Sequence, residues 1–253
     1  MNRNGSVILI VVIVIIGIVL IGVVLWFLFS NNSQTMASKY FTDPKEIALI
    51  DAASKGDLKG VQAAVQAGAD PNAFGIQSTT PLMAVMASAN KQGIQALLSV
   101  GADPNVTSTE GYSPIALAAE APDSAYLTMM LAAKGDANST DAQGRPLLLL
   151  AAIQDQWQNV DLLLQSGANI NAVDSSGYTT IMNLAGLGDY DHVLELINKG
   201  ADMTITTKTG ASLARIISHN LPLSDPAQIA AKQQVIQLLA AKGIKISTSS
   251  STQ

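Results

Sequence analysis

Ala67-Gly68-Ala69-Asp70-Pro71-Asn72 is a turn sequence that returns along the chain. The later copies keep a glycine followed by small and polar residues: Val100-Gly101-Ala102-Asp103-Pro104-Asn105, Lys134-Gly135-Asp136-Ala137-Asn138, Ser166-Gly167-Ala168-Asn169-Ile170-Asn171, Lys199-Gly200-Ala201-Asp202-Met203 and Lys242-Gly243-Ile244-Lys245. Their glycines are 33, 34, 32, 33 and 43 residues apart. A period this short predicts a solenoid, in which each unit packs only on its neighbours.

A second element opens each unit. It reads Thr80-Pro81-Leu82 and Gly111-Tyr112-Ser113-Pro114-Ile115, then more loosely Gly144-Arg145-Pro146-Leu147-Leu148, Gly177-Tyr178-Thr179-Thr180-Ile181 and Gly210-Ala211-Ser212. Glycine supplies a positive φ after a helix, and proline in a helix's first turn loses no hydrogen bond. The two elements together resemble the ankyrin repeat, in which a T-P-L-H turn opens a helix pair that ends at G-A-D-x-N. The resemblance covers roughly residues 43–246 and implies an all-α solenoid of about six helix-turn-helix repeats with short hairpin loops.

The sequence departs from the ankyrin pattern at the histidine of T-P-L-H. Its place is taken in successive copies by Met83, Ala116, Leu149, Met182 and Arg215. Loss of the usual histidine hydrogen bond predicts looser, more apolar joints between the repeats.

Val7 to Phe29 is an unbroken apolar run of about 23 residues. A helix of that length just spans a hydrocarbon core of about 30 Å. We expect a transmembrane signal anchor over 7–29, a cytoplasmic tail over 1–6, and a C-terminal domain on the periplasmic side of an inner membrane. A cleaved signal peptide is the alternative, but the nearest small-residue site lies well beyond Phe29. The orientation rests on Arg3 and the amino terminus, so the reversed topology stays open.

The folded domain is expected to begin at Asp43. Residues 30–42 are rich in polar residues and predict a flexible linker, whereas Asp43-Pro44 predicts an N-cap and the first residue of a helix. Asp225-Pro226 repeats this pattern after an inserted loop, so a closing helix is expected to run to about Ala241. Residues 247–253 form a polar tail that we expect to be disordered.

Few residues could carry out catalysis. The chain has no cysteine and two histidines, so no disulfide, zinc site or thiol nucleophile is expected. Repeat geometry places no serine or carboxylate near His192 or His219, which predicts that both are surface or packing residues. We therefore expect no enzyme activity, cofactor, metal or small-molecule substrate. The chain after Arg3 contains 13 basic and 19 acidic residues, and this excess of negative charge disfavours a nucleic acid partner.

The resemblance also implies where a protein partner binds, because ankyrin stacks recognise partners with their hairpin tips and the inner ends of their first helices. The matching positions are Ile76, Gln77, Thr79, Ser88, Thr109, Glu110, Tyr112, Glu120, Gln143, Arg145, Gln154, Ser175, Ser176, Tyr178, Leu187 and Lys208, with Phe74 as a further candidate. Tyr112 and Tyr178 lie two repeats apart, and such amphipathic rings are typical interface anchors. The alternative is that each tyrosine only covers its neighbouring hairpin. Trp157 and Tyr190 are expected to pack within the domain.

The sequence therefore predicts a non-catalytic, membrane-tethered protein that binds one protein partner on the outer side of the membrane. One anchor followed by a short run of repeats is similar to small bacterial ankyrin immunity proteins, which neutralise a secreted toxin such as a lipase effector. The alternative is a scaffold or assembly factor for an envelope enzyme, which would leave its partner active.

Overall fold

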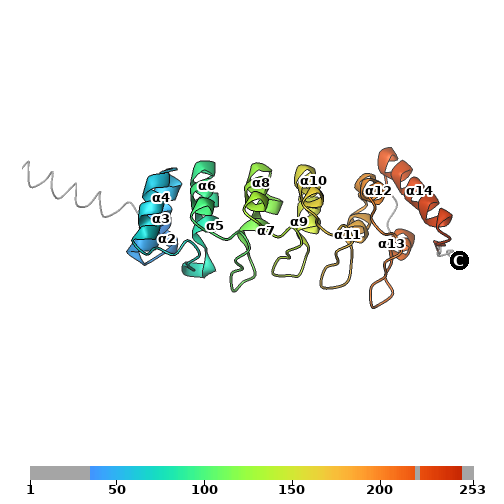
Figure 1. Ribbon diagram of the computed structural model, residues 1–253. Coiled ribbons are helices and arrows are strands. Elements are labelled where there is room, and N and C mark those ends of the chain that lie inside the picture. The colour runs from blue at the N-terminus through green and yellow to red at the C-terminus, as the bar shows by residue number, and fades with distance from the viewer. Residues whose placement is uncertain (1–34, 220–222, 247–253) are drawn as a thin grey trace, which may run out of the picture.

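The computed structural model describes residues 35–219 and 223–246, and these form a row of helix pairs (Figure 1). This part contains thirteen α-helices and one short 3-10 helix, with no strand beyond isolated bridges. The helices are α2 (Met36–Tyr40), α3 (Pro44–Ser54), α4 (Leu58–Gln66), η1 (Ile76–Ser78), α5 (Pro81–Ala87), α6 (Lys91–Ser99), α7 (Pro114–Glu120), α8 (Ala125–Ala132), α9 (Leu147–Ile153), α10 (Trp157–Gln165), α11 (Thr180–Leu187), α12 (Tyr190–Asn198), α13 (Leu213–His219) and α14 (Pro226–Ala241).

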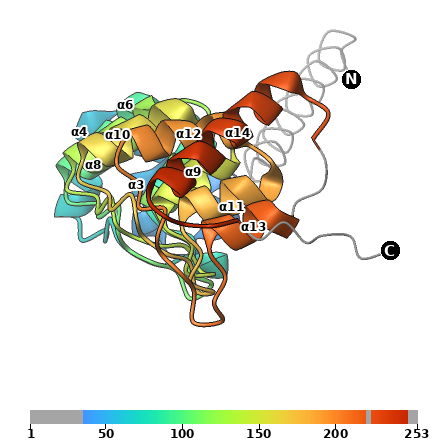
Figure 2. The same cartoon turned by 90° about the vertical axis from the view of Figure 1, so that its right-hand side faces the viewer.

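Five antiparallel pairs run from α3/α4 to α11/α12, and α13 with the oblique α14 ends the row; we number these pairs 1 to 6 in chain order. The first helices of successive pairs contact one another, as α7 contacts α9 and α9 contacts α11. Seen end-on, the first helices lie nearer the projecting hairpins and the second helices form a separate row (Figure 2). Buried side chains from all six pairs make one continuous core. The expected all-α solenoid is confirmed for the described residues.

The first helices begin at N-caps that recur every 33 residues. The hydroxyl groups of Thr80, Ser113 and Thr179 accept hydrogen bonds from the backbone N–H three residues later, at 3.3, 3.3 and 3.4 Å. Pro146 stands at the equivalent place before α9 and makes no side-chain cap. An N-cap satisfies one of the backbone donors that a helix leaves free at its start.

Tight hairpins connect the later pairs. Three isolated antiparallel bridges, Thr140 with Pro146, Val173 with Thr179 and Thr206 with Ser212, repeat at the same spacing. A short polar side chain inside each hairpin accepts a backbone N–H four residues on, as Thr207 does from Ala211 at 3.0 Å. The hairpins are therefore held by their own residues and project to one side of the solenoid (Figure 1).

A ladder of asparagines ties each of the first four turns to the turn that follows it. Asn105 donates to the Lys134 carbonyl at 3.1 Å and accepts the Asp136 N–H at 2.7 Å. Asn72 and Asn138 make the same two bonds to their next turns. The first turn has no earlier turn of the repeat before it, and there Glu46 of α3 accepts the Asp70 N–H instead, at 3.1 Å.

The N-terminal edge differs from the flexible linker expected over 30–42. Residues 36–40 form α2, capped by the Thr35 hydroxyl, and Phe41 is buried in the core. The domain thus begins before Asp43, although Asp43 does cap α3 as expected. Residues 30–34, the apolar run 7–29 and the tail 247–253 lie outside the described residues. No helix within the described ranges has the length and hydropathy needed to span a bilayer.

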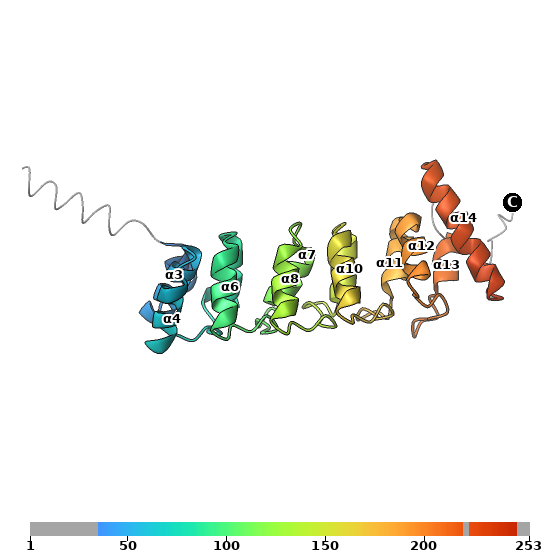
Figure 3. The same cartoon turned by 45° about the horizontal axis from the view of Figure 1, so that its top comes forward.

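The C-terminal end is closed by α14, which runs obliquely past α12 and α13 (Figure 3). Its bounds confirm the expected closing helix, and the Asp225 carboxylate accepts the Ala227 N–H at 2.9 Å. Gln228 of α14 accepts the Tyr190 N–H at 2.6 Å and so caps the start of α12. This contact attaches the closing helix to pair 5.

Candidate protein-binding groove

A groove of about 590 Å³ opens on the side of the solenoid formed by the hairpins and the first helices. Its lining comes from pairs 4, 5 and 6 and from the hairpins that precede pairs 4 and 5. The residues are Arg145, Leu149, Ile153, Asp174, Tyr178, Met182, Asn183, Gly186, Leu187 and Ile216. Because it crosses the joints between pairs, no single repeat could form it.

Two aspartates fix the hairpin edge of this groove. Asp141 accepts the Arg145 backbone N–H at 2.8 Å, and its second oxygen accepts the Arg145 Nε at 2.7 Å. Asp174, 33 residues later, accepts the Tyr178 N–H at 3.0 Å and the Asn183 side-chain amide at 3.2 Å. These bonds hold the hairpins that carry Arg145 and Tyr178 at the groove edge.

The floor is apolar. Leu149 of α9 and Met182 of α11 occupy equivalent places 33 residues apart, and both are buried. Ile153 and Ile216 are half-buried beside them. The groove therefore offers hydrocarbon surface next to the charged and hydrogen-bonding groups of the hairpin edge.

The end of α11 forms the open wall. Leu187 is 71% exposed, the largest exposure among the big apolar side chains of the described residues. Gly188 then ends the helix with a φ of 85°. An apolar side chain left in water beside a groove is a feature of surfaces that bind other molecules.

Carboxylates outnumber cations around Arg145, at the end of the groove toward pair 3. Glu120 at the end of α7 interacts electrostatically with Arg145 and Asp141. Partial burial raises the pKa of Glu120, an effect that Asp141 adds to and Arg145 opposes. Arg145 and Asp174 are the charged residues among those that line the groove, and Asp141 and Glu120 lie next to Arg145.

Comparisons with known proteins also indicate a repeat architecture. Residues 115–207 match the family model for ankyrin repeats, in three copies. A crystal structure of EF0377, described as an ankyrin repeat protein, is similar to this chain with a TM-score of 0.60 and 27% sequence identity, over 76% of this chain and 96% of that one. Residues 115–207 match ankyrin repeats, and the described residues as a whole have the fold of an ankyrin-repeat solenoid. Among curated proteins, none matches the sequence.

Ankyrin repeats mediate protein–protein interaction and are typically non-catalytic. The matched residues run from α7 to the hairpin before α13, so they include most of the groove. Protein binding is therefore the role that this fold supports.

The structure brings three of the expected contact residues together in the groove: Arg145, Tyr178 and Leu187. Phe74, Ile76 and Tyr112 lie further toward the N-terminus and are 55%, 51% and 52% exposed. Exposed positions on the hairpins and at the end of α9 hold Gln77, Thr109, Glu110, Gln143, Gln154, Ser175, Ser176 and Lys208. Thr79 and Ser88 are half-buried, and the Ser88 hydroxyl donates to the Val85 carbonyl at 2.7 Å. A role in binding remains a prediction for all of them.

Sequence reasoning missed the apolar half of the groove. Leu149 and Met182 stand where the ankyrin pattern has histidine, and this substitution was a usable signal. Ile153, Asn183, Gly186 and Ile216 carried no comparable signal, because they become neighbours only when three repeats stack.

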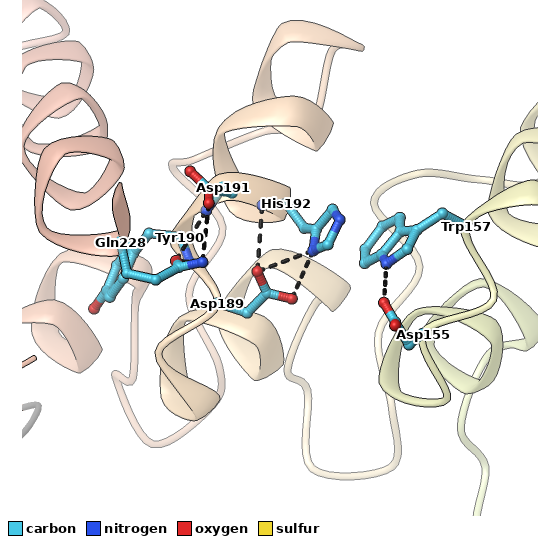
Figure 4. Close-up of polar contacts among 7 residues, drawn as sticks. All are labelled: Asp155, Trp157, Asp189, Tyr190, Asp191, His192 and Gln228. Atoms are coloured by element: carbon cyan, nitrogen blue, oxygen red, sulfur yellow. Dashed lines mark hydrogen bonds and ion pairs between the residues drawn. The ribbon is translucent and has the colours of Figure 1, made fainter. Parts of the chain in front are cut away.

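The expectation that no serine or carboxylate lies near the histidines is wrong. Asp189 caps α12 and contacts His192 Nδ1 at 2.8 and 2.9 Å, and the His192 ring stacks on Trp157 with centroids 3.5 Å apart (Figure 4). Ser218 Oγ lies 2.9 Å from His219 Nδ1. The Trp157 ring thus joins pairs 4 and 5 by packing, and Tyr190 is fully buried, as expected for core residues.

Proposed function

We propose that this chain is a non-catalytic binding protein whose groove between pairs 4, 5 and 6 holds a segment of one protein partner. The proposal rests on one observation. Arg145, Tyr178 and Leu187, which the sequence predicts as contact residues, line the same groove, and its floor consists of apolar side chains. A buried apolar centre with a polar rim is the usual composition of a specific protein interface.

The proposal includes a membrane tether through residues 7–29 and a periplasmic position for the solenoid. It rests on the apolar run in the sequence. A tether would confine the solenoid to the surface where its partner acts and raise the rate of encounter. An activity reporter fused after Gln253 tests this: activity only in the periplasm supports the orientation, whereas activity only in the cytoplasm rejects it.

We further propose that binding neutralises a secreted toxin such as a lipase effector. The support is the similarity of the layout to small ankyrin immunity proteins, with one apolar N-terminal run and about six repeats. An acidic chain of net charge −5 also suits a basic partner.

Co-purification from native membranes tests the binding function. Full-length chain should recover one partner in a one-to-one complex, and Leu187→Asp together with Tyr178→Ser should lose it. A matched control, Gln233→Asp on the exposed face of α14, should retain it. Recovery that is equal in all three proteins rejects the groove as the binding site.

An activity assay of the purified partner then separates the two roles. A neutralising protein lowers the partner's activity in proportion to the complex formed. A scaffold for an envelope enzyme leaves that activity unchanged.

A further inference from the structure

Glycines inside helices are uncommon because they lower helix stability by about 0.5–1 kcal/mol relative to alanine. The described residues contain three, Gly60, Gly93 and Gly186. A Cβ atom at Gly93 would collide with the Ala53 carbonyl, and one at Gly60 would crowd the Asp57 carboxylate. Close packing within the chain explains both of these glycines.

Gly186 has no such explanation. A Cβ atom added there would meet nothing within 4 Å, and the residue has no positive φ. Gly186 lies in the wall of the groove, one residue before the exposed Leu187. The missing side chain leaves a space that this chain does not fill.

Toward the other end of the groove, near Arg145, the charges are unbalanced. Asp141 is paired with Arg145, whereas neither Glu120 nor Asp174 has a lysine or arginine within salt-bridge distance among the described residues. Asp174 is satisfied by backbone and amide donors, so Glu120 is the carboxylate best able to take a cation from outside.

We infer that the partner segment places a large aliphatic or aromatic side chain over Gly186 and a lysine or arginine beside Glu120. The inference rests on the proposed function, since it names the chemistry of the segment that the groove receives. Contact of the apolar side chain with Leu149, Met182 and Leu187 would supply burial, and the cation would complement the excess negative charge.

Selection of random phage-displayed dodecapeptides against the full-length chain tests this inference. Selected peptides should share a large apolar residue and, several residues away along the peptide, a lysine or arginine. Synthetic copies, followed by fluorescence anisotropy, should bind Gly186→Leu about tenfold or more weakly than wild type, because the added leucine overpacks the filled groove. Glu120→Gln should also weaken binding.

The matched control is Ala230→Leu, which adds the same side chain to an exposed position of α14 away from the groove and should leave affinity unchanged. Melting temperatures of the variants establish that each is folded. Peptides without the apolar and basic pair, peptides that bind Gly186→Leu as tightly as wild type, or failure to select any peptide would overturn the inference.

The proposed function is judged separately, by the co-purification above. If wild type and Gly186→Leu recover the same partner equally, the inference fails while the chain is still a protein-binding solenoid. If wild type recovers no partner, the proposed function itself fails.

Discussion

Asn159 shows how one buried side chain joins two repeats. It is 1% exposed, and its amide donates to the Ala119 and Ala121 carbonyls at 3.0 and 2.8 Å. These carbonyls lie at the end of α7, where a helix leaves acceptors without internal partners. Asn159→Ala should therefore lower the free energy of unfolding by about 1–3 kcal/mol, because it leaves buried carbonyl acceptors without a hydrogen-bond donor. Denaturation followed by circular dichroism measures this, with the exposed Asn198→Ala as control; equal stability of the two variants would contradict the assignment.

Glu120 makes the stability of the domain depend on pH. Burial raises its pKa, so over the window above its ordinary pKa of 4.5 the folded chain binds more protons than the unfolded chain. Stability contributed by the protonated carboxyl is therefore lost as the pH rises through the folded-state pKa. Glu120→Gln should melt at a higher temperature than wild type at neutral pH, and the advantage should shrink as the pH falls below 4.5. A difference in melting temperature that stays constant across this range would argue against the burial of Glu120.

At the scale of single residues, sequence reasoning succeeded where the interaction is local. The Asp43 and Asp225 caps each bond an N–H two residues away and were expected from their type and position. The Asp189 contact with His192 is equally local, three residues apart, and could have been found by treating Asp189 as the N-cap of α12. The asparagine bonds between turns span about 30 residues and needed the stacked repeats to be seen.

At the scale of helices, two glycines should respond oppositely to the same substitution. Gly93→Ala in α6 should lower stability by about 1–3 kcal/mol or more, because the new methyl group meets the Ala53 carbonyl of α3. Gly186→Ala in α11 should raise stability by about 0.5–1 kcal/mol, because the new Cβ enters open space and the helix gains propensity. Denaturant unfolding of both variants decides this; a loss of stability at Gly186 would mean that the groove wall is packed after all.

The helix starts and the closing helix followed from the sequence, because caps, prolines and the 33-residue spacing act within or between neighbouring segments. Helix α2 did not, since five residues are too few to show a helical periodicity within a polar stretch. It is stabilised by tertiary contacts, through burial of Ala37 and Phe41 against the first pair. Short helices generally depend on such packing.

At the scale of the whole molecule, the repeat spacing predicted the stack, because each pair contacts only its neighbours. The groove could be predicted only in part. Arg145, Tyr178 and Leu187 were found by their repeat positions, whereas the shape of the cavity depends on side chains from three repeats and on the absent one at Gly186. A pattern within one repeat holds no information about such a shape.

Site-specific photo-crosslinking in native membranes tests most directly whether the groove is where this protein binds its partner. A photoreactive amino acid replaces Leu187 in the full-length chain, and Ala230 on α14 in the control. We expect one discrete crosslinked protein from position 187, much reduced by Tyr178→Ser and absent from position 230. No crosslink at 187, or the same products from both positions, would contradict this expectation.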